Sequence, residues 1–149
     1  MAQADWQEFS SEKGGFTVLM PGTPSEETRT DKTEDGRPYK QHYFAATQPE
    51  GVYLVTYSDF PGQEVNQVDP NIVLEAVIEG FLSDGGEVVS DHEVSLAGYP
   101  GRDIEFTDSD GLSGSTQVFL VEGRIYQLVA VASNPDDVQM FFDSFELTD

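Results

Sequence analysis

The sequence predicts an α+β fold in which a mainly antiparallel sheet of about six to eight strands lies between helices. Two observations carry this prediction. The segment 123–132 is apolar at both alternating sets of positions, which a strand needs only when something packs on each face of its sheet. Two further segments, beginning at Asp69 and Asn134, carry the start signals and apolar spacing of amphipathic helices. A sheet covered on both faces accounts for all three segments.

The N-terminal quarter of the chain predicts two short strands and one exposed segment. Residues 6–9 and 15–20 alternate between apolar and polar side chains, and residues 10–14 form the turn between them. Residues 25–37 are hydrophilic throughout and include the turn signal Glu34-Asp35-Gly36. We interpret 25–37 as an exposed edge strand or a mobile loop.

The next segments predict a hairpin and then a helix. Residues 39–47 and 52–58 flank a short loop, and both arms are rich in tyrosine and valine, so the hairpin belongs inside the sheet. Asp69 is the expected N-cap of the helix, and Pro70 takes its first position. Its apolar stripe consists of Leu74, Val77, Ile78, Phe81 and Leu82.

The rest of the chain predicts a strand, three neighbouring antiparallel strands and a closing helix. Residues 88–96 read as the first strand, and the turn Ala97-Gly98 leads to antiparallel strands at 99–106, 116–121 and 123–132, with turns at 108–111 and Glu122-Gly123. Asn134 is the expected cap of the second helix, and Pro135 begins it. The buried stripe of this helix consists of Val138, Phe141, Phe142 and Phe145.

Length and charge limit the partners. We expect one domain, residues 1–149, and a monomer. The formal net charge of −21 disfavours nucleic acid and anionic membrane surfaces as partners, and the acidic coat favours solubility. Residues 41–149 hold only Arg102 and Arg124 as basic side chains.

The chain contains no cysteine, so it forms no disulfide or thiolate metal site. No apolar stretch is long enough to span a membrane.

The sequence contains no catalytic signature, so we do not expect an enzyme. Ser113 lies one position too early for a nucleophile elbow in the Gly111–Ser115 segment. The glycine-rich segments lack the spacing of phosphate-binding loops. His42 and His92 each lie alone on a strand pattern, without a second imidazole at metal-ligand spacing.

A divalent cation is a candidate ligand of the turn at 108–111. Asp108 and Asp110 alternate as in the opening of a calcium loop, but Phe119 stands where the bidentate glutamate belongs. An ordinary hairpin turn is therefore favoured over calcium or manganese binding, and no other cofactor is expected.

Arg102 and Arg124 are the most informative charged side chains, because cations are rare in this chain. Both follow a glycine turn at the start of a strand. Ion pairing with Asp103, Glu105 or Glu122 is the favoured interpretation. The functional alternative is a small pocket in which Arg102 and Arg124, with Tyr99 and Tyr126, hold a carboxylate of a partner.

Several motifs resemble a recurrent small bacterial domain that is frequent in cyanobacteria. They are Trp6-x-x-Phe9, Gly15-Phe16-x-Val18-x-Met20-Pro21-Gly22-x-Pro24, 98–103, 123–128 and 142–145. The expected architecture is similar to that of PsbP, the extrinsic subunit of photosystem II, and of the Ran-release factor. The resemblance implies an antiparallel sheet between helices and a role in binding proteins.

The function expected from this resemblance is a non-catalytic protein-interaction or assembly module, associated with a photosystem and with a membrane-complex subunit as partner. Binding of calcium or manganese by the acidic surface is one alternative, and an enzyme of unrecognised type is another. Ala2-Gln3-Ala4 has the form left beside a signal-peptidase cut. It therefore favours the thylakoid lumen or periplasm, and the cytoplasm remains open.

Overall fold

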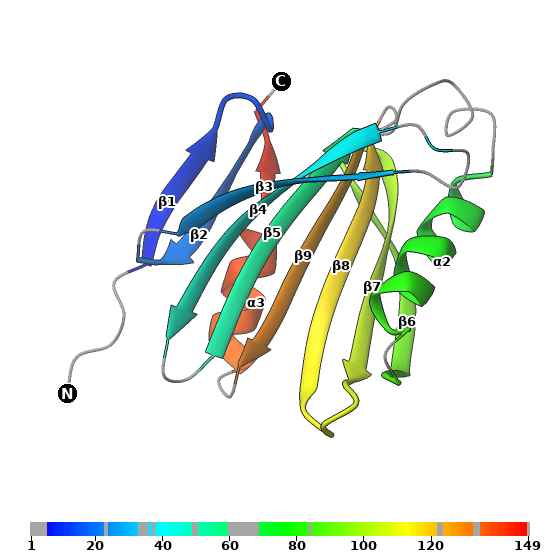
Figure 1. The fold of residues 1–149 in the computed structure, drawn as a ribbon. Coiled ribbons are helices and arrows are strands. Elements are labelled where there is room, and N and C mark those ends of the chain that lie inside the picture. Colours follow the sequence, from blue (N-terminus) through cyan, green and yellow to red (C-terminus); the bar gives the residue numbers. More distant parts are fainter. Residues whose placement is uncertain are drawn as a thin grey trace.

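The computed structural model describes residues 6–22, 24–32, 36, 38–48, 51–59, 69–83, 85–121, 124–132 and 135–148. Its strands and helices follow the predicted order up to α3, and a short strand that was not predicted, β10, comes after that helix (Figure 1). They are β1 (Trp6–Ser11), β2 (Phe16–Pro21), β3 (Ser25–Lys32), β4 (Pro38–Gln48), β5 (Gly51–Asp59), α2 (Pro70–Phe81), β6 (Glu87–Leu96), β7 (Tyr99–Thr107), β8 (Ser113–Val121), β9 (Arg124–Ala132), α3 (Pro135–Asp143) and β10 (Glu146–Leu147).

The strands form two antiparallel sheets. The main sheet has seven strands in the order β3-β4-β5-β9-β8-β7-β6, and the small sheet has three in the order β1-β2-β10. Figure 1 shows the small sheet and α3 together on one side of the main sheet, and α2 on the other side beside β6, β7 and β8. The antiparallel sheet between helices is therefore confirmed.

Strand β9 lies at the centre of the main sheet and is covered on both faces. Tyr126 and Leu128 belong to the apolar core beneath α3, whereas Ile125 and Val129 belong to a second core beneath α2. The double burial predicted for this segment is confirmed, since alternate side chains of a strand point to opposite faces.

The core beneath α3 is aromatic and includes the small sheet as well as the helix. The Phe16 ring of β2 lies 5.7 Å from Phe44, 6.0 Å from Tyr126 and 5.3 Å from Phe145, measured between ring centroids. Edge-to-face and tilted rings at such distances stabilise a core beyond the area that they bury. The strands β1 and β2 were predicted as strands, but their position as a separate layer beside α3 was not.

The core beneath α2 is smaller, because one short helix covers that face. The Asp69 carboxylate caps the helix by accepting a hydrogen bond from the Asn71 backbone N–H at 2.9 Å, as predicted. Leu74 and Ile78 are buried against β7 and β8 side chains. A helix is about 10 Å wide, so it covers about two strands at a spacing of roughly 4.8 Å. The strands beyond β8 are therefore less covered on this face.

The edges and turns follow local sequence signals. Residues 25–32 form the edge strand β3 of the main sheet. Of the two interpretations of 25–37, the edge strand is therefore correct for this part. The turn between β6 and β7 places Ala97 and Gly98 at φ 52° and 87°, as a tight hairpin turn requires. The predicted cap Asn134 and the turn Glu122-Gly123 lie outside the described residues.

Truncating one buried side chain on each face tests the double-sided core. Leu74→Ala beneath α2 and Phe141→Ala in α3 each remove a side chain with no exposed surface. Each is expected to lower the free energy of unfolding by about 3 kcal/mol in chemical denaturation. Ile72→Ala, at a position 60% exposed on α2, is the control and should change it by less than about 0.5 kcal/mol. A negligible effect of either core substitution would contradict the two-sided arrangement.

Candidate functional site

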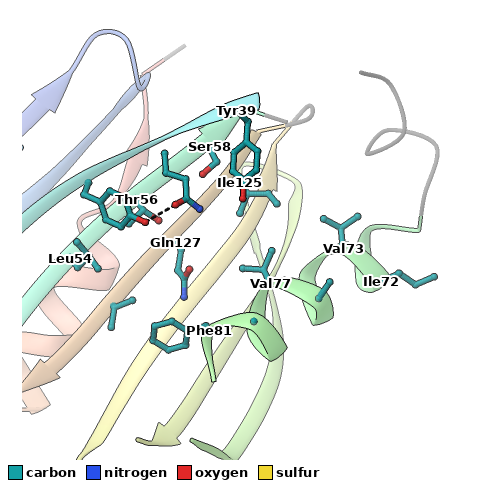
Figure 2. Close-up of a pocket in the computed structure, with 15 residues that line it drawn as sticks. Tyr39, Leu54, Thr56, Ser58, Ile72, Val73, Val77, Phe81, Ile125 and Gln127 are labelled. Atoms are coloured by element: carbon teal, nitrogen blue, oxygen red, sulfur yellow. Dashed lines mark hydrogen bonds between the residues drawn. The ribbon is translucent and has the colours of Figure 1, made fainter. Parts of the chain in front are cut away.

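An open groove of about 760 Å³ lies between α2 and the less covered strands β4 and β5, with Ile125 and Val129 of β9 at its base (Figure 2). Its size falls in the range of ligand and peptide sites. Figure 2 shows Val77 and Phe81 pointing from the helix toward the strands. The lining residues are Tyr39, Gln41, Tyr43, Leu54, Thr56, Ser58, Ile72, Val73, Ala76, Val77, Gly80, Phe81, Ile125, Gln127 and Val129.

The groove is apolar with a few amide and hydroxyl groups. The Tyr43 hydroxyl donates to Gln41 Oε1 at 2.6 Å, and Gln127 Nε2 donates to Thr116 Oγ1 at 3.1 Å. Among the described residues that line the groove, none is an aspartate, glutamate, lysine, arginine or histidine. General acids and bases are most often histidine, glutamate, aspartate or lysine, and less often tyrosine or cysteine. The groove is therefore suited to binding uncharged groups rather than to proton transfer.

Sequence reasoning found the strand alternation but missed the groove. The signal was present in part, since Leu54, Thr56 and Ser58 occupy alternate positions of β5 and face the groove. What the sequence lacks is the position of α2 over the sheet. Only its packing on β7 and β8 leaves the face of β4 and β5 open.

Arg124 holds the small sheet to the main sheet. Its Nε and Nη2 donate to the Asp59 carboxylate at 2.6 and 2.9 Å, and its Nη1 donates to the backbone oxygens of Gly14 and Lys13 at 2.9 and 3.1 Å. The Tyr126 hydroxyl donates to the same Gly14 oxygen. These contacts raise the pKa of Arg124, mainly through the hydrogen bond with Asp59. Most of the guanidinium's hydrogen-bonding groups thus bind acceptors within the chain.

Tyr57 links this arginine to one of the two histidines. The Arg124 guanidinium carbon lies 4.8 Å from the centre of the Tyr57 ring, and His42 stacks on that ring at 4.5 Å between centroids. Burial lowers the pKa of His42 and raises that of Tyr57, because it disfavours the charged form of each. Both rings are therefore held in their neutral forms beside a permanent cation.

The structure brings together three of the four residues predicted to bind a partner. Tyr99, Arg124 and Tyr126 line a hollow of about 340 Å³ beside the turn that joins β1 to β2. Arg102 lies on the opposite face, because the register pairs it with Val118 and then with Gln127 of the groove. The four therefore do not form one pocket, and a role of these residues in partner binding stays a prediction.

Arg102 forms ion pairs, but with partners other than those predicted. Its Nη1 donates to Asp91 of β6 at 2.9 Å, and its Nη2 lies 3.5 Å from Glu75 of α2. The same nitrogen donates to Asn71 Oδ1 at 3.4 Å. The expected partners Asp103 and Glu105 lie on its own strand, where adjacent side chains point to the opposite face. Arg102 thus connects α2 to the β6 edge of the main sheet.

The side chain of Asp108 stabilises the hairpin turn between β7 and β8. Its Oδ1 accepts hydrogen bonds from the backbone N–H groups of Asp110 and Leu112, both at 2.9 Å. This contact pattern is that of an Asx turn. Within the part of the chain that the structure describes, no group of three or more acidic or histidine side chains is placed to hold a metal ion. Cation binding by Asp108 and Asp110 stays a prediction.

Replacing Arg124 tests its role between the sheets. Arg124→Met is expected to lower the free energy of unfolding by about 2 kcal/mol, since it removes hydrogen bonds to Asp59 and to two backbone oxygens. Arg29 makes a similar pair with Glu27 at 2.8 Å and also lies over a tyrosine ring, but its side chain is 60% exposed. Arg29→Met is the matched control and should change the free energy of unfolding far less in the same denaturation experiment, because this pair is exposed to solvent. Equal effects of the two substitutions would contradict the role given to Arg124.

Replacing Asp108 distinguishes a role in stabilising the turn from a role in binding a cation. Asp108→Ala should lower the melting temperature by a few degrees, about 1 kcal/mol, because two turn N–H groups lose their acceptor. The decrease should be the same with and without millimolar calcium, as measured by thermal denaturation. Stabilisation of the unmodified protein by calcium that Asp108→Ala abolishes would instead favour the cation site.

Among the described residues, no helix has the length and apolar character needed to cross a lipid bilayer.

No protein-family model and no curated protein matches this chain. Solved structures match it by fold. Cyanobacterial PsbP (CyanoP) from Synechocystis sp. PCC 6803 has a TM-score of 0.61 and 14% sequence identity, and the match covers 98% of this chain and 94% of that one. LpqN, involved in cell envelope biogenesis of Mycobacterium tuberculosis, has a TM-score of 0.41 and 15% identity over 85% of this chain and 86% of its own. The match to CyanoP spans nearly the whole of both chains, and this protein therefore has the PsbP-like fold.

Proposed function

We propose that this chain is a non-catalytic accessory module that binds a protein partner in the groove between α2 and strands β4, β5 and β9. The observation that carries the proposal is the groove lining, which among the described residues is uncharged and largely apolar, in a chain of net charge −21. An exposed apolar surface of this kind, bordered by polar residues, is typical of an interaction site.

The exposure of single side chains supports the same function. Ile72 is 60% exposed at the start of α2, beside the half-buried Val73. A large aliphatic side chain on the rim of an apolar groove gains free energy when a partner covers it. Catalysis has no comparable support, since the lining offers no charged acid or base.

The finer form of the proposal concerns partner and compartment. The PsbP-like fold, shared with a cyanobacterial protein, supports a membrane-complex subunit of a photosystem as the partner. It also supports a location outside the cytoplasm, in the thylakoid lumen or periplasm. Because a fold alone does not specify a function, this finer form depends on the experiment below. Calcium or manganese binding remains the alternative that the Asp108 experiment tests.

Site-specific photocrosslinking tests the groove directly. A benzoylphenylalanine placed at Ile72 in living cells should give a discrete adduct with one protein. The same probe at Val89, which is 64% exposed on β6 outside the groove, should not give that adduct. The adduct should disappear when Gly80→Phe fills the groove.

An adduct that persists with Gly80→Phe, or that Val89 also gives, would mean that the groove is not the contact. The absence of any protein adduct at Ile72 would contradict the proposed function itself.

A further inference from the structure

We propose that the occupant of the groove is an amphipathic helix of the partner, with an uncharged apolar face toward the strands and lysine or arginine side chains beside α2. This inference rests on the proposed function, because it names the kind of segment that the same groove would bind. Four features of the described residues lead to it: the width of the uncovered sheet, its lining, the charges along α2, and the small residues on that helix.

The width of the open sheet face suits one additional helix. α2 packs on β7 and β8, whereas the groove extends over β9, β5 and β4. Three strands at about 4.8 Å span roughly 14 Å, and a helix with its side chains is about 10 Å wide. A helix beside α2 would therefore complete the layer that α2 begins. Binding of an amphipathic helix in an apolar groove is a recurring mode of peptide recognition.

The lining selects against charge on the buried side of the occupant. Leu54, Ile125 and Val129 form an apolar floor, and Gln41 and Gln127 add carboxamides. A charged side chain buried there would lose its water without gaining an opposite charge, which is costly. Apolar side chains would bury area, and an occasional hydroxyl or amide could pair with the glutamines. The buried face of the occupant is therefore uncharged.

The charges along α2 select basic residues on one flank of the occupant. Glu75 and Glu79 are exposed and lie one turn apart. Glu75 lies toward Arg102 on the β6 side of the helix, away from the groove, whereas Glu79, at about 100° per residue, is about 40° closer to the groove residues Ile72 and Ala76. On the opposite side of the groove, β3 carries the ion pair of Glu27 with Arg29 at 2.8 Å, which is neutral as a pair. A basic side chain of the partner would thus pair with Glu79 of α2, and the net charge of −21 would speed its approach.

The small residues on α2 leave room for a neighbouring helix. Ala76 and Gly80 are exposed, line the groove and lie one turn apart. A Cβ atom added at Gly80 would meet no other atom within 4 Å. The space is therefore open to an incoming side chain. A bulky residue at Gly80 should also be tolerated by the fold, since most residues favour a helix more than glycine does.

Three stapled peptides of about 18 residues test the inference, since such a helix is about 27 Å long. All share one leucine and alanine face and differ only on the flanks, which carry lysine, glutamine or glutamate. Fluorescence anisotropy measures their affinity for the full chain. The lysine peptide should bind about tenfold more tightly than the glutamate peptide at roughly 50 mM salt, and the difference should shrink at roughly 500 mM.

Groove variants separate specific binding from attraction by overall charge. Gly80→Phe should lower the affinity for the lysine peptide by about tenfold, as expected when a groove contact is blocked. Val89→Phe, outside the groove, should change its affinity by less than about twofold. Glu79→Lys should lower the affinity for the lysine peptide and raise the affinity for the glutamate peptide, each by about two- to fivefold.

Several results would overturn the inference. They are an affinity that Gly80→Phe leaves unchanged, equal binding of the three peptides, and no binding of any of them. A dimer in sedimentation that Gly80→Phe dissociates would assign the groove to a second copy of the chain. If the Ile72 adduct maps to an extended or acidic segment of the partner, the inference fails while the proposed function stands. If Ile72 gives no adduct, the proposed function fails whatever the peptides do.

Discussion

Strand β9 hydrogen-bonds to β5 on one side and to β8 on the other, and it carries apolar side chains on both faces. Such a strand is stable only at the centre of a sheet with packing on each side. This requirement places the hairpin of β4 and β5 on one side and the strands β6, β7 and β8 on the other. It also requires α2 and α3 to lie on opposite faces.

The two faces meet this requirement unequally, and the difference produces the site. Beneath α3, the small sheet adds a second covering element, and Phe16 fills the space between them with aromatic contacts. Beneath α2, a single helix of 12 residues covers part of a seven-stranded sheet. The face of β4 and β5, next to β9, is therefore left with an open groove whose described lining residues are uncharged. The two arginines act at the margins of this arrangement, with the half-buried Arg124 joining the two sheets and the buried Arg102 joining α2 to the edge of the main sheet.

Local patterns in the sequence were sufficient for the elements and for the fold class. The alternation of apolar and polar residues identified the strands, and Asp69 and Pro135 marked the starts of the helices. These signals can be read from the sequence because helix capping and side-chain periodicity depend only on residues close together in the chain. The relative positions of side chains on different strands were not accessible in this way. Whether Arg102 and Arg124 share a face depends on the register across β8, which the turns set. The groove depends on where α2 rests on the sheet, and that is decided by packing.

Hydrogen exchange of the backbone amides, followed residue by residue by NMR, tests the central claim most directly. If β9 is the strand buried on both faces, its amides exchange only through global unfolding and are the slowest in the chain. The amides of β3 and of the outer side of β6, which lie at the two edges of the main sheet, exchange faster. Exchange of the Leu128 to Ala130 amides as fast as that of β3 would contradict the two-sided core and the groove derived from it.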